Sequence, residues 1–366
     1  MELNQKQKQA VEMAEAWFRN PDKQIFKLAG YAGTGKTTTA TTIAKMLTKD
    51  EDTLFCAFTG KAACVMRQKG MPGRTIHSAI YNFKRRYDSA AKRYYYERHL
   101  KDSLPFKLII VDEASMVGAD VAADLLSFGI PVLAIGDPGQ LPPVGDCFSN
   151  MLKNPDIVLD EIMRQADGNR IPLFAMQLRK GWEPKAQDFP PGPDVKVVRP
   201  DFLIKHFPRI LEKADQIICA KNETREVLND QARKFYRREE RLNEGEKIVR
   251  RENDWERIVF SQSIGDLSLV KGMTGTASNV RSLPRNHFLF DFTPDCAKDA
   301  TFHDLAYNKF DYAYAITCHA SQGSEYPFVV VVDDSWNDYK NPDFQAEWRY
   351  TAATRAKEKL LWVTNR

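Results

Sequence analysis

One glycine-rich segment near the N-terminus constrains the fold more than any other feature. Residues 30–37 read G-Y-A-G-T-G-K-T and fit the pattern G-x4-G-K-T. A short apolar run, 24–29, precedes the segment, and residues 38–47 carry apolar side chains at helical spacing. Between a strand and a helix, glycines let backbone N–H groups converge on an anion at the positive end of the helix. The sequence therefore favours a phosphate-binding loop over a plain tight turn, with the contacts made by Gly30, Gly33, Thr34, Gly35, Lys36, Thr37 and Thr38.

Two of these residues have distinct chemical roles in such a loop. Lys36 can reach the β- and γ-phosphates of a nucleoside triphosphate, and the hydroxyl of Thr37 can bind Mg²⁺. The pattern therefore predicts ATP and Mg²⁺ as cofactors.

Two later strand ends carry further candidates. An apolar run, 108–111, ends in Asp112 and Glu113, where Asp112 can hold Mg²⁺ through water and Glu113 can polarise the attacking water. Apolar runs followed by two carboxylates are common, but this one follows the loop by some 75 residues. The next predicted strand, 132–135, leads into residues 136–144, where Gln140 can sense the γ-phosphate; the alternative is a proline-rich turn.

Length and composition limit the class of protein. A chain of 366 residues is too long for one ordinary core, so we expect at least two domains. The net charge of +4 permits nucleic-acid binding without requiring it. No run of eighteen apolar residues and no signal-like start is present, so we expect a cytoplasmic protein. Six scattered cysteines without a C-x2-C pair argue against a zinc or iron–sulfur site and fit reduced thiols.

The order of apolar runs predicts the organisation of the chain. Strands alternate with helices up to about residue 160, which is typical of a parallel α/β sheet. A second such domain follows, with an extended connection at 182–200 and a charged helix at 223–241. Each domain carries a small insertion: a basic and aromatic segment at 81–101, and short β-like pieces at 250–304. Further strands are predicted at 53–58, 107–111, 216–220, 313–317, 328–332 and 360–363.

The combination of these segments resembles the superfamily 1 DNA helicases of the RecD/Dda branch. The resemblance runs from residue 3 to residue 363 in family order, and it implies a protein of a bacterium or of a phage-infected cell. It implies an α/β fold with two RecA-like parallel-sheet motor domains in tandem (the P-loop NTPase fold). The resembling segments are 30–37 (motif I), 58–63 (motif Ia), 75–78 (the TIH element), 112–113 (motif II), 136–144 (motif III), 162–165 (the arginine element), 317–325 (motif V) and 350–357 (motif VI).

The resemblance also implies domain boundaries. Motor domain 1A would comprise residues 1–78 and 105–157, with a pin-like 1B insertion at 79–104. Motor domain 2A would comprise residues 158–249 and 307–366, with a small β-barrel-like (SH3-like) 2B insertion at 250–306.

Further nucleotide-site residues follow from the resemblance. Gln7 would read the adenine edge, although a solvated glutamine is the alternative. Arg164 and Arg355 would act as arginine fingers on the γ-phosphate rather than as surface salt-bridge arginines. Gly323 would let the backbone approach the nucleotide, and Glu325 would form a hydrogen bond close to it.

The DNA contacts implied by the resemblance are polar and not sequence-specific. They are Thr59, Lys61, Thr75, His77, Thr317, His319 and Ser321, although the two histidines could instead be core or capping residues. In the 1B segment an aromatic ring would stack on the last base pair, the candidates being Phe83, Tyr94, Tyr95 and Tyr96. A charged surface hairpin without DNA contact is the alternative for this segment.

The favoured hypothesis is an ATP-dependent helicase that translocates on single-stranded DNA, with 5′-to-3′ polarity implied only by the resemblance. Its partners would be single-stranded DNA and single-strand/duplex junctions, together with replication or recombination proteins such as a single-strand-binding protein, and it would act as a monomer. The alternative is a DNA-stimulated ATPase that displaces proteins or gates a complex with little unwinding. A small-molecule P-loop kinase would not need the second half of the chain. The sequence does not distinguish among replication, recombination and repair.

Overall fold

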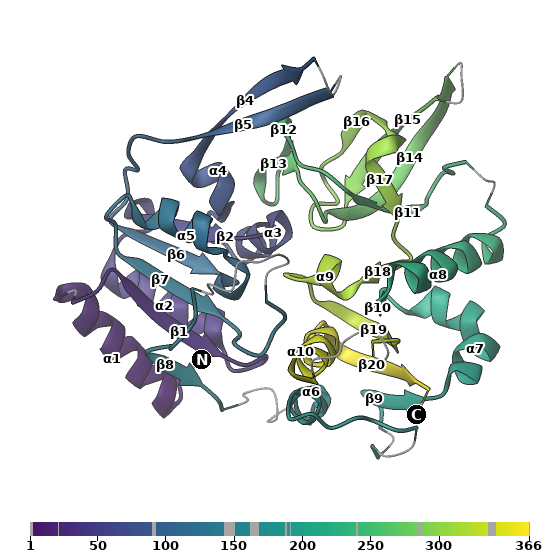
Figure 1. The fold of residues 1–366 in the computed structure, drawn as a ribbon, viewed down its shortest axis with the longest axis horizontal. Coiled ribbons are helices and arrows are strands. Elements are labelled where there is room, and N and C mark those ends of the chain that lie inside the picture. The colour runs from purple at the N-terminus through teal and green to yellow at the C-terminus, as the bar shows by residue number, and fades with distance from the viewer. Residues whose placement is uncertain are drawn as a thin grey trace. The chain divides into compact units, whose positions relative to one another are not determined.

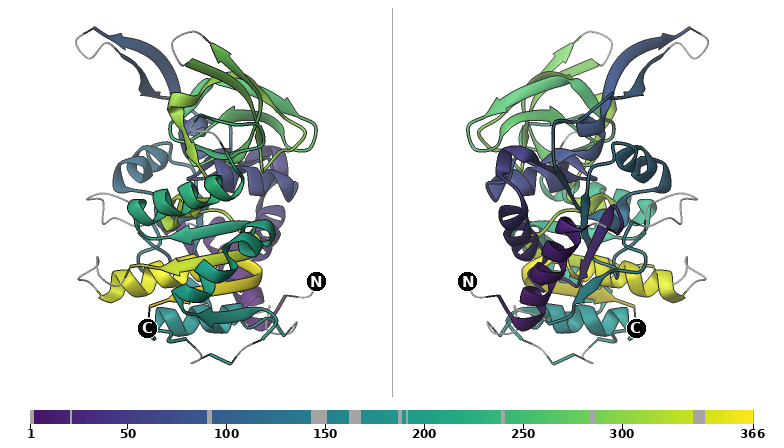
Figure 2. Two further views of the ribbon diagram at one scale, coloured as in Figure 1. Left: turned by 90° about the vertical axis from the view of Figure 1, so that its right-hand side faces the viewer. Right: turned by 90° about the vertical axis from the view of Figure 1, so that its left-hand side faces the viewer.

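The chain forms two compact units, which the ribbon views show (Figures 1 and 2). The first unit comprises Met1–Pro138 and Pro142–Met163, and the second comprises Gly139–Leu141 and Arg164–Arg366. The computed structural model describes residues 3–20, 22–89, 93–142, 151–161, 168–186, 189–190, 192–238, 241–283, 287–335 and 342–365.

The first unit is built on a six-stranded parallel sheet in the order β3-β2-β6-β7-β1-β8. The inner strands read as continuous apolar runs because they are buried on both faces. Since all strands run in one direction, their carboxyl ends meet at one edge, where ligands bind in such sheets. The strands are β1 (Ile25–Gly30), β2 (Thr53–Ala57), β3 (Arg74–Thr75), β6 (Leu108–Asp112), β7 (Val132–Gly136) and β8 (Ile157–Leu159).

Helices cover both faces of this sheet. One core layer joins α1, α2 and α3 to side chains such as Leu28 and Ile110, and the other joins α4 and α5 to side chains such as Ile109 and Val111. Two short 3-10 turns, at Asp50–Asp52 and Ala114–Met116, complete the connections. The helices are α1 (Gln5–Arg19), α2 (Lys36–Leu47), α3 (Gly60–Gln68), α4 (Ile76–Ile80) and α5 (Ala119–Leu126).

An antiparallel hairpin of β4 (Tyr81–Asp88) and β5 (Arg93–Leu100) leaves the first unit directly after α4 (Figure 1). Lys101 closes its base. The Lys101 amide donates to the Ile80 carbonyl at 2.9 Å, and its ammonium donates to the carbonyls of Ser78 at 3.2 Å and Ala79 at 2.7 Å. The hairpin, which occupies the predicted insertion, is thus fastened to the last turn of α4.

The second unit contains a five-stranded parallel sheet in the order β18-β10-β19-β20-β9. Helices α7 and α8 share a core with Leu361 and Val363 on one face. On the other face α6 and α10 pack around Trp362, whose ring lies 5.5 Å from Phe174 and 6.4 Å from Trp348. The elements are α6 (Ile171–Arg179), β9 (Val195–Val198), α7 (Pro200–Lys213), β10 (Gln216–Cys219), α8 (Asn222–Phe235), β18 (Ala315–Thr317), α9 (Cys318–Ser321), β19 (Tyr326–Asp333), α10 (Pro342–Ala353) and β20 (Ala356–Thr364).

The insertion of the second unit is an antiparallel sheet in the order β16-β15-β14-β11-β17 with a separate hairpin, β12–β13. Its core includes Phe310, whose ring centroid lies 5.1 Å from that of Phe290 and 5.2 Å from that of Phe292. Within the described residues no strand pairing closes this sheet into a barrel. The strands are β11 (Lys247–Arg250), β12 (Asp254–Ser261), β13 (Gly265–Leu269), β14 (Thr274–Leu283), β15 (His287–Pro294), β16 (Phe302–Ala306) and β17 (Phe310–Tyr312), with a 3-10 turn at Tyr307–Lys309.

The predicted fold class is confirmed, since each unit has a RecA-like parallel sheet covered by helices. The domain boundaries stay a prediction, although strand pairing crosses two of them. The end of domain 1A at 157 falls within β8, and the 2B segment of 250–306 leaves out residues 247–249 of β11 and all of β17, which pair with each other. Strand pairing joins residues far apart in the chain, which spacing along the sequence does not reveal.

Two predicted elements also differ from the structure. The helix expected over 223–241 ends at Phe235, and Arg237 adopts a left-handed conformation (φ 53°) that a continuing helix cannot accommodate. The connection expected at 182–200 contains β9, which pairs with β20 and forms an edge of the second sheet. Its prolines flank the strand, and the run from Val195 to Val198 is too short to predict a strand.

Candidate functional site

The phosphate-binding loop lies between β1 and α2, at the carboxyl edge of the first sheet. Gly33 (φ 80°) and Gly35 (φ 78°) take left-handed conformations that favour glycine. Gly30 is required for a different reason: a Cβ there would lie 2.7 Å from Thr34 Oγ1 and 3.0 Å from Leu159 Cβ. The glycines predicted from the motif are therefore the residues that this loop conformation requires.

The carbonyl oxygen of Tyr31 organises the loop. It accepts from the Thr34 amide at 3.3 Å, from Thr34 Oγ1 at 2.8 Å and from Lys36 Nζ at 2.9 Å. Lys36 Nζ also lies 3.8 Å from Oδ2 of Asp137, which is fully buried. Oxygen atoms thus hold the ammonium at the start of α2, where phosphate oxygens can take their place. Sequence reasoning missed Asp137, although a carboxylate directly after an apolar strand is the signal that identified Asp112.

Gln7 braces the loop from α1. Its Oε1 accepts from the Asn4 amide at 3.0 Å, and its own amide donates to Asn4 Oδ1 at 2.7 Å, which forms a capping box at the start of the helix. Its Nε2 donates to the Thr34 carbonyl at 3.0 Å. Because Gln7 is buried, the alternative of a solvated glutamine is wrong; adenine reading by Gln7 stays a prediction.

The two predicted carboxylates lie at the same sheet edge. Asp112 ends β6, whose neighbour β7 pairs in turn with β1. Glu113 adopts a left-handed conformation (φ 53°), and its amide donates to Asp112 Oδ1 at 2.8 Å. A non-glycine residue held in this region costs of order 1–3 kcal/mol and is common at functional sites.

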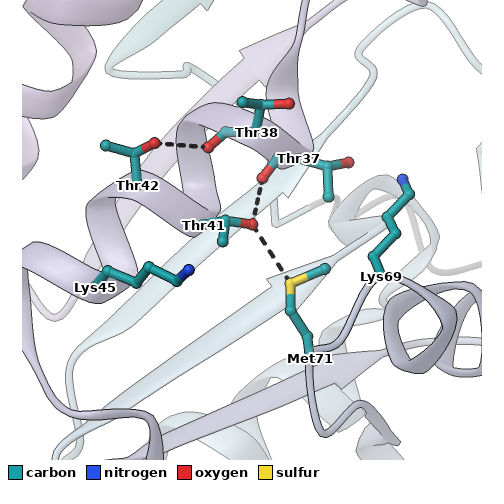
Figure 3. A pocket seen from close by; sticks show the side chains of 7 residues that line it. All are labelled: Thr37, Thr38, Thr41, Thr42, Lys45, Lys69 and Met71. Atoms are coloured by element: carbon teal, nitrogen blue, oxygen red, sulfur yellow. Dashed lines mark hydrogen bonds between the residues drawn. The ribbon is translucent and has the colours of Figure 1, made fainter. Parts of the chain in front are cut away.

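A pocket of about 310 Å³ opens beside the loop, on the flank of α2 (Figure 3). Thr41 donates to the Thr37 carbonyl at 2.8 Å and Thr42 donates to the Thr38 carbonyl at 3.0 Å, so these two hydroxyls are used within the helix. No carboxylate belongs to the lining, which consists of Thr37, Thr38, Thr41, Thr42, Lys45, Lys69 and Met71.

Two predicted DNA-contacting threonines are helix N-caps. Thr59 Oγ1 accepts from the Ala62 amide at 3.1 Å at the start of α3. Thr75 Oγ1 accepts from the Ser78 amide at 3.1 Å at the start of α4. Each therefore lies where a strand ends and a helix begins. Lys61, in the first turn of α3, is half-buried.

His77 is a neutral, aromatic-packed residue on α4. Its ring lies 5.7 Å from Phe58 and 5.9 Å from Tyr81. Burial, and then the charge of Arg98, lower the pKa of His77 below its ordinary value of 6.5. At neutral pH His77 can therefore offer a hydrogen bond but not a positive charge to a ligand.

The hairpin has two distinct faces. Residues directly opposite each other in an antiparallel pair share a face. One face therefore carries Phe83, Arg85, Tyr87, Tyr96 and Arg98. The other carries Lys84, Arg86, Tyr95, Glu97 and His99.

The aromatic residues that are candidates for stacking on a base pair therefore lie on both faces of the hairpin. Tyr95 is 48% exposed and lies on the opposite face from Tyr96. Phe83 is half-buried and packs against the core at the base of the hairpin, with its ring centroid 6.3 Å from that of Tyr81; its stacking on a base pair stays a prediction. The side chain of Tyr94 lies outside the described part of the structure.

The corresponding residues of the second unit surround α9. Thr317 is the N-cap and accepts from the Ala320 amide at 3.4 Å. His319 lies 6.4 Å from the Phe344 ring, and burial lowers its pKa. Ser321 is fully buried and donates to the Cys318 carbonyl at 2.6 Å; its contact with DNA stays a prediction.

Arg355 is a buried cation held by neutral groups. Its guanidinium donates to the carbonyls of Thr351 and Ser324, each at 3.1 Å, and to Thr354 Oγ1 at 3.2 Å. No carboxylate of the described residues forms an ion pair with it. Arg164, the second predicted arginine finger, lies outside the described residues.

The loop predicted to approach the nucleotide lies beside Arg355. Gly323 has the left-handed conformation (φ 73°) that favours glycine. Glu325, however, is exposed and forms an ion pair with Lys357 at 3.4 Å. Its predicted hydrogen bond close to the nucleotide stays a prediction.

Gly139, Gln140 and Leu141, which lie shortly after β7 in the chain, belong to the second unit. The Leu141 amide donates to Thr351 Oγ1 at 2.9 Å, and its carbonyl accepts from Gln322 Nε2 at 3.2 Å. Gln140, which precedes Leu141, is buried, and its Oε1 has no hydrogen-bond partner in the described structure. A buried oxygen without a hydrogen-bond partner is unusual in folded proteins.

The described residues contain neither a metal-binding cluster nor a membrane-spanning helix. No group of three or more His, Cys, Asp or Glu side chains could hold a metal ion there. No helix within the same ranges has both the length and the apolar character of a membrane span. The five described cysteines are free thiols, as the scattered spacing predicts.

A phosphate loop, carboxylates at two neighbouring strand ends and a second parallel-sheet unit together define a P-loop nucleoside triphosphatase with tandem RecA-like domains. Comparison with known families agrees. Residues 2–190 match the family model described as "AAA domain", and residues 312–363 match the "UvrD-like helicase C-terminal domain". The chain therefore belongs to the AAA-domain family.

Two curated relatives are similar in sequence. The ATP-dependent RecD2 DNA helicase of Deinococcus radiodurans is 28% identical in an alignment of 363 residues that covers 92% of this chain and 46% of the relative. The uncharacterized protein R530 of Acanthamoeba polyphaga mimivirus is 30% identical in an alignment of 193 residues that covers 44% of this chain and 39% of the relative. The chain thus spans less than half the length of these relatives.

Two solved structures share the fold. The Pif1 helicase from Candida albicans has a TM-score of 0.57 at 17% identity, with 100% of this chain and 94% of that one covered. The Pif1 helicase from Bacteroides in complex with ADP-AlF3 and single-stranded DNA has a TM-score of 0.59 at 17% identity, with 99% and 92% covered.

Proposed function

We propose that this chain is an ATP-dependent DNA helicase that translocates 5′ to 3′ on single-stranded DNA. The observation that carries the proposal is Arg355, a buried arginine without a carboxylate partner among the described residues, in a second RecA-like unit. A phosphate-binding enzyme with one motor domain has no use for such a residue. The Arg355 guanidinium and a negative charge that develops on a γ-phosphate would stabilise each other.

The first unit would bind the triphosphate. The amides of the loop and the start of α2 would surround the phosphates, and the Lys36 ammonium would exchange the Tyr31 carbonyl for phosphate oxygens. Thr37 and Asp112 fit Mg²⁺ because the ion prefers hydroxyl and carboxylate oxygens. When bound, Mg²⁺ would neutralise phosphate charge.

Hydrolysis would then depend on Glu113, Gln140 and the two arginines. Glu113 would orient and deprotonate the attacking water, and the unpaired amide oxygen of Gln140 would respond to the γ-phosphate or to that water. Arg164 and Arg355 would stabilise the charge that develops during hydrolysis. Binding and loss of the γ-phosphate would drive relative motion of the two units.

DNA would be bound without reading sequence. The N-caps Thr59, Thr75 and Thr317 lie at helix starts, where amide groups favour phosphates. The neutral His77 and His319 would add hydrogen bonds, and the exposed hairpin would separate strands at a junction.

The relatives support this proposal through their names. One is an ATP-dependent DNA helicase, a Bacteroides Pif1 helicase was solved in complex with ADP-AlF3 and single-stranded DNA, and a further Pif1 structure concerns unwinding at forked duplexes by two coordinating helicases. We further propose that the chain acts as a monomer on single-strand/duplex junctions and works with replication or recombination proteins.

The test is unwinding of fluorescent duplexes that differ only in their tail. We expect opening of a duplex with a 5′ tail, none with a 3′ tail, and none with Lys36→Ala. Opening only from a 3′ tail would refute the polarity. DNA-stimulated hydrolysis with neither duplex opened would replace the helicase with the protein-displacing ATPase.

A further inference from the structure

A second pocket lies in the second unit, between α7 and the strands β9 and β20. Its volume is about 350 Å³, within the range of small-ligand sites. Part of its lining is apolar and comes from separate elements: Phe202 and Ile210 of α7, Phe328 of β19 and Leu361 of β20. Phe202 and Phe328 are only half-buried, so the pocket exposes aromatic surface to solvent.

The rim of this pocket is positively charged. Lys196, Arg209, Lys213 and Lys359 all line it, all are exposed, and none forms an ion pair with a described carboxylate. On α7 the lining positions are 202, 206, 209, 210 and 213, which form one stripe along the helix. Cations from a helix and from two strands therefore converge on one apolar depression.

The nearby carboxylates do not neutralise this rim. Asp194, the acidic residue of the lining, is held by Arg170, which donates to Asp194 Oδ1 from Nη2 at 2.7 Å and from Nε at 2.9 Å. Asp215, close to Phe328, accepts from the Phe328 amide at 2.8 Å. The positive charges of the four rim residues therefore lie next to the apolar lining of the pocket.

We infer that this pocket docks an acidic peptide that carries a bulky apolar side chain. The apolar lining would bury that side chain, and the cations would pair with carboxylates on either side of it. A nucleic-acid strand fits less well because base stacking needs an open aromatic face. The Phe202 ring is contacted by the Lys196 ammonium at 4.1 Å and by the His206 ring at 4.4 Å.

The pocket is separate from the residues assigned to nucleotide. It lies on the α7 face of the second sheet with Leu361, whereas α10, which carries Thr351, packs on the opposite face around Trp362. The inference therefore does not depend on the proposed helicase activity. Peptide binding there would leave the phosphate loop and Arg355 untouched.

The test is a fluorescence-anisotropy titration of the full chain with a labelled hexapeptide of five aspartates followed by phenylalanine. Arg209→Glu and Lys359→Glu should each weaken binding at least tenfold. Lys205→Glu is the matched control: it makes the same charge change on an exposed position of α7 outside the pocket, and should weaken binding less than twofold. A peptide ending in alanine should bind at least fivefold more weakly. Circular dichroism would verify that each variant is folded.

Several results would overturn the inference. They are no saturable binding of the acidic peptide, equal binding of a peptide with five lysines, or the same loss for Lys205→Glu as for Arg209→Glu. The site would belong to nucleic acid instead if an oligothymidylate displaced the peptide and itself bound tenfold more weakly to Arg209→Glu.

Discussion

Replacing Gly35 by alanine tests how the phosphate loop is braced. A Cβ on Gly35 would lie 2.5 Å from Gln7 Nε2, and the residue has a φ of 78°. The left-handed conformation costs alanine about 1–2 kcal/mol. Gln7 would also have to move, which breaks its hydrogen bond to the Thr34 carbonyl at a cost of about 1 kcal/mol. Loss of the capping box with Asn4 adds about 1 kcal/mol.

We therefore expect Gly35→Ala to lower the local stability of α1 and α2 by about 3–4 kcal/mol, the sum of these contributions. Gly70→Ala is the matched control, because Gly70 is also left-handed (φ 82°) but has nothing within 4 Å of the added Cβ. It should cost only the conformational strain, about 1–2 kcal/mol.

The assay is hydrogen exchange, measured by mass spectrometry on peptides that cover α1 and α2. In a Gln7→Ala background the obstructing side chain, its hydrogen bond and its part in the capping box are already gone, so Gly35→Ala should cost about 2 kcal/mol less than in the parent chain, which leaves only the conformational strain. Strictly additive effects of the two substitutions would refute the reasoning, since they would mean that Gln7 and the loop do not constrain each other.

The remaining predictions concern activity, the hairpin, thiols and pH. Lys36→Ala should abolish ATP hydrolysis; DNA-stimulated turnover in that variant would contradict the phosphate-loop assignment. Alanine at all three tyrosines of residues 94–96 should leave translocation intact and abolish unwinding, and a loss of ATPase would mean that the segment is structural. Burial raises the pKa of the Cys56 and Cys318 thiols to about 12, so mass spectrometry should detect iodoacetamide adducts on them only after denaturation. The folded state lowers the pKa values of His77 and His319, so the free energy of unfolding should fall as the pH drops below 6.5; His77 contributes at most about 1.4 kcal/mol per pH unit, and His77→Gln should remove that contribution and leave the contribution of His319.

The phosphate loop could be predicted because its requirements are local. Gly33 and Gly35 adopt backbone conformations that other residues resist, and that demand is visible in the order of residues alone. Asp112 could be placed for a similar reason, since an apolar run followed by a carboxylate marks a strand end. The same rule, applied one strand later, would have identified Asp137.

Other features depend on packing that spacing does not reveal. Ser321 follows its motif, yet the turn of α9 directs its hydroxyl to the Cys318 carbonyl rather than to solvent. Gln7 is one of three glutamines within five residues, and only the tertiary structure shows that it, and not Gln5 or Gln9, contacts the loop. The short strand β9 exists because β20 offers a partner far along the chain.

The divided hairpin is an intermediate case. Adjacent tyrosines in a strand must point to opposite faces, so the split between Tyr95 and Tyr96 follows once the segment is known to be a strand. The sequence shows crowded aromatic and basic residues there without a clear alternation of apolar and polar positions. The structure was therefore needed to identify the segment as a strand and to place Tyr95 and Tyr96 on opposite faces of the hairpin.

The attachment of the hairpin at Lys101 has a mechanical consequence. Eight residues per strand make an arm about 26 Å long, and its fixed end is the helix that bears His77. Tilting the arm would stretch three hydrogen bonds from Lys101 to α4, so a load at the tip acts as a torque on that helix. Resistance met at the end of the hairpin is thereby transmitted to Thr75 and His77 as strain, without any contact between the tip and those residues.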